Sequence, residues 1–97
     1  MLDDKITTLT DDGASRLIEA IVRQAVNDYK NSLYKYNTIR EKKKRKEHKY
    51  MIGNCELFFT KNIDTYCDLD GIKIMNKIRE DVKKDLAFKG IKMRIPR

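Results

Sequence analysis

The residues with the clearest chemical character are five consecutive cations near the middle of the chain: Lys42, Lys43, Lys44, Arg45 and Lys46. They belong to a basic stretch, residues 40–49, that carries seven Lys or Arg side chains against two Glu. Cations near the start of a helix face the partial positive charge of its free amides, which costs about 0.3–1 kcal/mol each. Local stability therefore does not select this run. We interpret it as a site for phosphate groups or for an acidic protein surface, with a solvated helix face as the alternative.

Metal chemistry finds little support in the sequence. Cys55 and Cys67 are the only cysteines and His48 is the only histidine, so a zinc site with the usual spacings cannot be assembled. The acidic residues before Gly71 resemble part of a calcium loop, but the position of the last, bidentate ligand then falls on Lys77. We therefore expect both cysteines to be buried, reduced thiols and predict no metal and no cofactor.

A catalytic role is not expected either. The chain has no glycine-rich phosphate loop, and its one histidine, His48, lies in the basic stretch without a nucleophile beside it. Most Asp and Glu side chains fall on the solvent faces of predicted helices. The protein is therefore predicted not to be an enzyme, and its function is expected to be binding.

Apolar periodicity predicts the helices that position these residues. It indicates an all-α fold: a long antiparallel helical hairpin, residues 18–36 against 39–59, with a third C-terminal helix from Asp68 to Leu86. Thr38 to Glu41 match a capping box, which would start the second helix at Ile39.

The chain is short enough for one helical domain over residues 1–97. We expect a flexible N-terminal arm (1–11), with a helix start at Thr10 to Asp12, and a basic C-terminal tail (88–97). Charged residues make up 38% of the 97 residues, so the core must be thin. Because apolar residues occupy more than one side of the first helix, a homo-oligomer, most simply a dimer, is predicted.

Several single residues receive specific expectations. Tyr29, Tyr34 and Tyr36 are either a stacking surface for bases or core and edge residues of the first helix. Tyr34 is further considered as an exposed aromatic anchor for a protein partner. Gly53 is expected to allow the close approach of another helix, and Phe58 is expected to be buried.

The net charge of +7 favours an anionic partner. The sequence shows neither a signal peptide nor an apolar stretch approaching the ~20 residues of a membrane span. We therefore expect an intracellular protein without a membrane segment.

Three stretches carry a resemblance: residues 21–29 (IVRQAVNDY), 55–59 (CELFF) and 67–71 (CDLDG), the last followed by Ile74. They resemble a group of short phage and prophage proteins of Gram-positive bacteria. In that group a Phe pair leads to a Trp-Phe pair before an Asp-Gly, whereas Ile63 and Asp64 stand near that place here. The matching positions are expected to be core and capping residues rather than a site. The resemblance implies an accessory role in the cytoplasm of a bacterial host, without naming a reaction.

Two functions follow as expectations. The first is a phage-type protein that binds a bacterial host protein or defence complex stoichiometrically and inhibits or redirects it. The alternative is a sequence-tolerant nucleic-acid-binding protein that uses residues 42–46 and the basic tail. A nucleotide is kept as another candidate partner.

Overall fold

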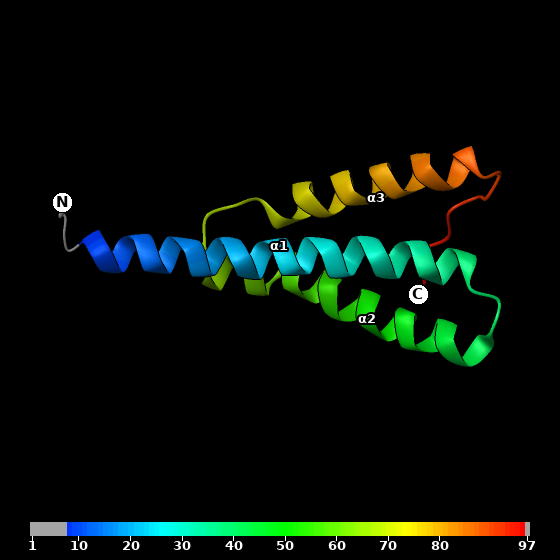
Figure 1. The fold of residues 1–97 in the computed structure, drawn as a ribbon, viewed down its shortest axis with the longest axis horizontal. Helices are drawn as coiled ribbons and strands as arrows, with labels where there is room; N and C mark the ends of the chain where they lie inside the picture. Colours follow the sequence, from blue (N-terminus) through cyan, green and yellow to red (C-terminus); the bar gives the residue numbers. More distant parts are fainter. Residues whose placement is uncertain (1–7, 97) are drawn as a thin grey trace.

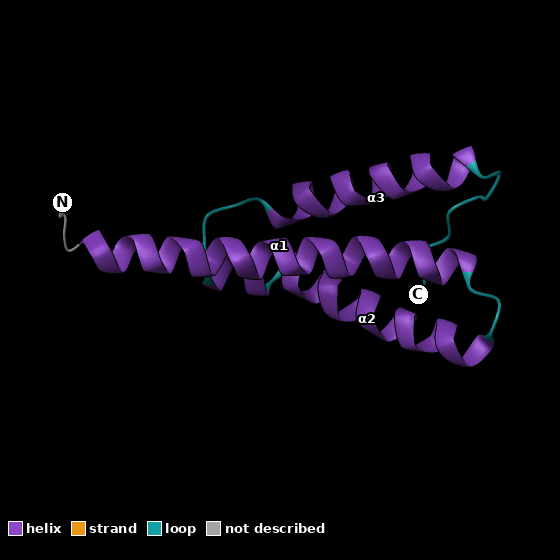
Figure 2. Cartoon of the chain, in the orientation of Figure 1, coloured by secondary structure: helices purple, strands orange, loops and turns teal. Residues whose placement is uncertain are grey.

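The computed structural model describes residues 8–96, and all regular secondary structure within them is helical. Helix α1 spans Thr8–Thr38, α2 spans Lys42–Thr60 and α3 spans Gly71–Phe88, while a short 3₁₀ turn, η1, covers Asn62–Thr65. No strand occurs within residues 8–96. The predicted all-α fold is therefore confirmed (Figure 2).

The three helices run up, down and up. Helices α1 and α2 form the predicted antiparallel hairpin, and α3 returns alongside α1 in the same direction (Figure 1). The N-terminal end of α1 projects beyond the other two helices, and the molecule measures 53 × 25 × 18 Å. Within the described residues, no helix combines the length and the apolar character that crossing a membrane requires.

The connection between α1 and α2 differs from the prediction. Helix α1 continues through Thr38, whose hydroxyl donates a hydrogen bond to the carbonyl oxygen of Tyr34 at 3.0 Å. Helix α2 begins only at Lys42, and the preceding Glu41 makes no capping bond with its side chain. The predicted capping box is wrong because Thr38 keeps a helical backbone and satisfies its hydroxyl inside α1.

The other helix starts are also displaced. Helix α1 begins at Thr8, before the predicted start, so residues 8–11 of the expected flexible arm are helical, whereas residues 1–7 lie outside the described residues. Helix α3 begins at Gly71 rather than at Asp68. Its N-cap is Asp70, whose Oδ1 accepts a hydrogen bond from the backbone N–H of Lys73 at 3.1 Å.

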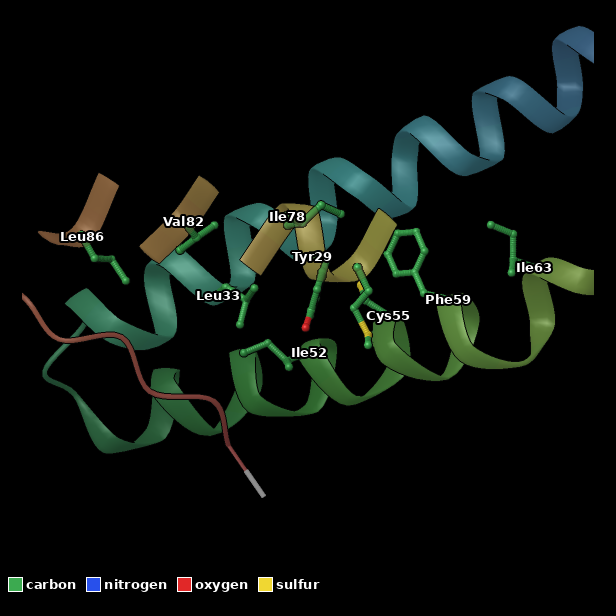
Figure 3. Packing of buried hydrophobic residues seen from close by; sticks show 10 residues of the cluster. Tyr29, Leu33, Ile52, Cys55, Phe59, Ile63, Ile78, Val82 and Leu86 are labelled. Carbon is green, nitrogen blue, oxygen red and sulfur yellow. The ribbon is translucent and has the colours of Figure 1, made fainter. Parts of the chain in front are cut away.

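One apolar cluster joins all three helices and η1 (Figure 3). Its buried members are Tyr29, Leu33, Ile52, Cys55, Phe59, Ile63, Met75, Ile78, Val82 and Leu86. Phe59 is 1% exposed, whereas Phe58 is only half-buried and packs on the edge of the Phe59 ring at 5.4 Å between ring centroids. The expectation that placed Phe58 in the core is wrong by one residue, because a shift of one position turns a helical side chain by about 100°.

The close approach expected at Gly53 occurs at Gly71 instead. Gly53 is exposed on α2, and nothing lies within 4 Å of the position that a Cβ would occupy. A Cβ on Gly71 would lie 1.9 Å from the carbonyl oxygen of Phe59. Gly71 therefore lets the first residue of α3 rest directly on the backbone of α2.

A polar network crosses the core with one residue from each helix. The Tyr29 hydroxyl donates to Glu56 Oε2 at 2.9 Å and accepts from Arg79 Nε at 2.7 Å, and Arg79 Nη2 contacts the same carboxylate oxygen at 2.8 Å. Burial raises the pKa of the Tyr29 phenol well above its usual range, so its hydroxyl stays a donor at neutral pH. The network fixes the register of the three helices because each partner satisfies the other two.

The C-terminal tail folds back towards the loop that joins α1 and α2 (Figure 1). Gly90 ends α3 with a φ of 74°, a conformation that favours glycine. The tail then runs in an extended conformation without forming a strand, and Ile91, Met93 and Ile95 pack against the core cluster. The Asn37 side chain holds the tail by accepting from the N–H of Arg94 at 2.7 Å and donating to its carbonyl oxygen at 3.0 Å.

Candidate binding surfaces

The predicted basic run lies at the N-terminal end of α2, beside the loop of the hairpin. Of its five cations, only Arg45 is half-buried. The other four are exposed: Lys42, Lys43, Lys44 and Lys46. Lys44 lies 4.0 Å from the carboxylate of Glu41, a weak pair at the surface. The run is thus available to solvent and to an anionic partner.

Tyr34 lies apart from the basic run. Its ring is half-buried, and the ammonium of Lys89 lies 4.8 Å from the ring centroid and hydrogen-bonds the phenol oxygen. Tyr34 is therefore less exposed than predicted, because Lys89, the residue after α3, lies over its ring, and its role as an anchor for a partner stays a prediction. Tyr36, on another face of α1, is the tyrosine that lines hollows beside Lys42 and Arg45.

An apolar groove lies between α1 and α3, on a different part of the surface. Its larger section has a volume of about 660 Å³, within the usual range of about 300–1,000 Å³ for ligand sites, and is lined by Val26, Leu69, Ile74 and Ile78. A second section of about 450 Å³ continues on the other side of Leu69, past Ile18, Val22 and Cys67.

We call this surface the α1–α3 groove and define it by six residues: Ile18, Val22, Val26, Cys67, Leu69 and Ile74. Its α1 wall is a stripe at i, i+4 and i+8, the spacing of one helical face. Leu69 is the centre of the groove, since it lines both sections and is 51% exposed. Charged residues of α3 form the rim, including Lys77 and Asp81, whose charged groups lie 3.3 Å apart.

The sequence contained part of the signal for this groove. The apolar residues on more than one side of the first helix indicated an uncovered apolar surface, but the loop that carries Leu69 showed no periodicity to place that residue. Neither Val26 nor Leu69 was predicted as a site residue. The groove arises because the segment before α3 crosses α1 (Figure 1).

The two cysteines are free thiols in the structure; Cys55 is buried as predicted, whereas the expected burial of Cys67 is wrong, because its side chain is half-buried and lines the α1–α3 groove. Burial raises the pKa of the Cys55 thiol to about 11, and nearby Asp28 and Glu56 act in the same direction, so Cys55 is protonated at neutral pH. Among the residues that the structure describes, His, Cys, Asp and Glu side chains do not gather as they would around a metal ion.

Comparisons with known protein families, with curated proteins and with solved structures find no match to this chain.

Proposed function

We propose that this chain is a small phage-type accessory protein that binds a bacterial host protein or defence complex stoichiometrically and thereby inhibits or redirects it. The observation that carries the proposal is the α1–α3 groove, an apolar surface with an exposed leucine at its centre. The resemblance to short phage proteins supplies the class of target and the place of action, the host cytoplasm.

The shape of the groove indicates how a partner would dock. An amphipathic helix can lay an apolar face into such a groove, with anchors at i, i+3 or i+4 and i+7. Leu69 would contact the centre of that helix, and the mixed charges of the α3 rim, Lys73, Lys77, Glu80 and Asp81, would set its orientation.

The test is capture of a partner from bacterial lysate with matched leucine variants. We expect wild type to retain one protein at a fixed molar ratio, and Leu69→Glu to lose it because a charge then occupies the apolar centre. Leu57→Glu is the control, since Leu57 is 46% exposed on α2 and lines neither section of the groove. Equal capture by both variants would refute the groove as the binding surface.

Self-association belongs to the same proposal. Leu17 is 63% exposed in the N-terminal half of α1, and a second copy would cover it. We expect sedimentation equilibrium at micromolar concentration to give a dimer, and Leu17→Glu to shift it towards the monomer. Wild type that stays monomeric across this range would contradict the expectation.

A sequence-tolerant nucleic-acid-binding protein is the second candidate function. The observation in its favour is the exposure of four cations of the run at the end of α2, next to a docked basic tail. Binding would then fall with salt at a log-log slope of about −0.7 to −0.9 per phosphate contact.

A further inference from the structure

Helical geometry divides the basic stretch into two faces. Lys42, Arg45, Lys46 and Lys49 recur at i, i+3, i+4 and i+7, so they share one face of α2. Together with Tyr36 of α1 they line a hollow of about 290 Å³. Lys43 and Lys44 line none of the hollows at this end of the molecule.

A second hollow, of about 370 Å³, adjoins the first and shares Tyr36 and Arg45 with it. Its other cations are Arg40, from the loop of the hairpin, and Arg94, from the C-terminal tail. Arginines from three separate segments thus surround one space. Guanidinium groups bind phosphate oxygens through paired hydrogen bonds, which makes three of them a strong phosphate-binding arrangement.

The charge of these hollows is not compensated by the protein. Neither lining contains Asp or Glu. None of the six lining cations forms an ion pair with a carboxylate of residues 16–96: Arg40, Lys42, Arg45, Lys46, Lys49 and Arg94. The first turn of α2 also contains no acidic residue. Repulsion between these cations disfavours the arrangement locally, and a bound polyanion would relieve it.

An aromatic side chain completes the surface. Tyr36 lines both hollows and is half-buried, so its ring is held in place by the core while part of it remains open. Aromatic rings beside basic grooves stack on nucleobases without reading their sequence. A phosphate chain alone would not use this ring, whereas a nucleotide would.

We propose that the two hollows at the loop end of the hairpin form one site for a nucleotide, with phosphate groups held by Arg40, Arg45 and Arg94 and the base stacked on Tyr36. The ligand is either a free nucleoside triphosphate or a nucleotide unit of a single strand, because both present the same chemistry. The site rests on the basic surface alone and does not depend on the α1–α3 groove, so either proposal can fail without the other.

Asn37 is a positioning residue of this site. Its carboxamide binds both the N–H and the carbonyl oxygen of Arg94, which anchors the tail by its backbone and leaves the guanidinium free to reach the hollow. The half-buried Ile91 and Ile95 flank this anchor and hold the tail on the core cluster. The tail is therefore a structural part of the site.

Two double variants of the same charge test which face binds. Lys42→Glu with Lys46→Glu alters the hollow, whereas Lys43→Glu with Lys44→Glu alters its neighbours in the same helical turns. Calorimetric titrations would use ATP, a short oligothymidylate and inorganic triphosphate at two salt concentrations. We expect the first variant to weaken binding of ATP or of the oligothymidylate about tenfold to a hundredfold, and the second about twofold or less.

The outcomes separate the parts of the proposal. Tighter binding of ATP or of the oligothymidylate identifies the source of the nucleotide and supports the site in either case. Equal weakening by the two double variants would overturn it in favour of unspecific attraction, and so would a lack of binding at low salt. Inorganic triphosphate should bind at least about fivefold more weakly than ATP, and equal affinities would overturn the role of Tyr36. Glutamates at the start of a helix favour the helix, so unfolding does not explain a loss.

A double-mutant cycle tests the role assigned to Asn37. Asn37→Ala and Arg94→Ala should weaken binding to similar extents, and each should lower the log-log salt slope by about 0.7. Because Asn37 acts through Arg94, the double variant should bind no more weakly than Arg94→Ala alone. Additive losses, or an unchanged salt slope in Asn37→Ala, would refute the positioning role.

Discussion

Phe59→Ala is expected to lower the free energy of unfolding by about 3–5 kcal/mol. Phe59 is 1% exposed, and its ring packs on Tyr29 at 5.9 Å and on Phe58 at 5.4 Å between ring centroids. The cavity left by the missing phenyl ring cannot be filled by rearrangement of the neighbouring side chains, because the core of this short chain is a single cluster. Urea denaturation of wild type and variant gives the difference.

Phe58→Ala provides the matched control for this experiment. Phe58 precedes Phe59 on the same helix but is half-buried, with Tyr66 as its other aromatic neighbour at 6.1 Å. Truncation there should cost less than about half as much, because less apolar surface returns to water. Equal losses at the two positions would contradict the placement of Phe59 inside the cluster.

Gly71→Ala is expected to have the second large effect, a loss of about 3 kcal/mol or more or a failure to fold. The new Cβ would lie 1.9 Å from the carbonyl oxygen of Phe59 and 2.8 Å from Cγ2 of Ile63. The backbone of Phe59 cannot rotate away as a side chain can, so the start of α3 would have to separate from α2. Thermal and urea denaturation would show the loss.

Gly53→Ala should behave in the opposite way. Gly53 lies inside α2 with nothing within 4 Å of the added methyl group, so alanine should stabilise the helix by about 1 kcal/mol. Similar effects of the two substitutions would show that α3 does not rest on the backbone of α2 at Gly71.

These two glycines illustrate how far sequence reasoning reaches. The helices follow from apolar spacing, which is a local property, and the three of them and the hairpin were predicted correctly. Which glycine allows the close approach of another helix depends on where the helices cross. The spacing of apolar residues along one helix does not predict that crossing point. Gly53 was therefore chosen as the glycine inside a predicted helix, whereas the contact occurs at Gly71.

Polar contacts over long sequence separations were also beyond prediction. Tyr29 and Arg79 are fifty positions apart, and Asn37 and Arg94 fifty-seven, so no spacing rule connects them. Asn37 is of a residue type that is common at helix ends, but its side chain anchors the tail. Such roles depend on the completed fold.

The candidate binding residues could be predicted in part from the sequence. Exposure of the basic run was predictable because five consecutive cations cannot be buried, and residues 42–46 are indeed at the surface or half-buried. The helical period divides the run into two faces, one that lines the hollows and one that lies outside them. Which face lines the hollows is known only once α1 is placed beside Lys42 and Lys46. Tyr34 and Tyr36 were both considered as aromatic contact residues and both are half-buried, but local spacing could not show that Lys89 lies over Tyr34 whereas Tyr36 lines the hollows beside Lys42 and Arg45.

The proposed function is the binding of a folded partner through the α1–α3 groove. The most direct measurement repeats the capture from bacterial lysate after nuclease treatment, with wild type, Leu69→Glu and the Lys42→Glu, Lys46→Glu double variant. The groove predicts that the same protein is retained by wild type and by the double variant, at an unchanged molar ratio, and is lost with Leu69→Glu. Retention by Leu69→Glu, or loss of the captured protein on nuclease treatment, would contradict it.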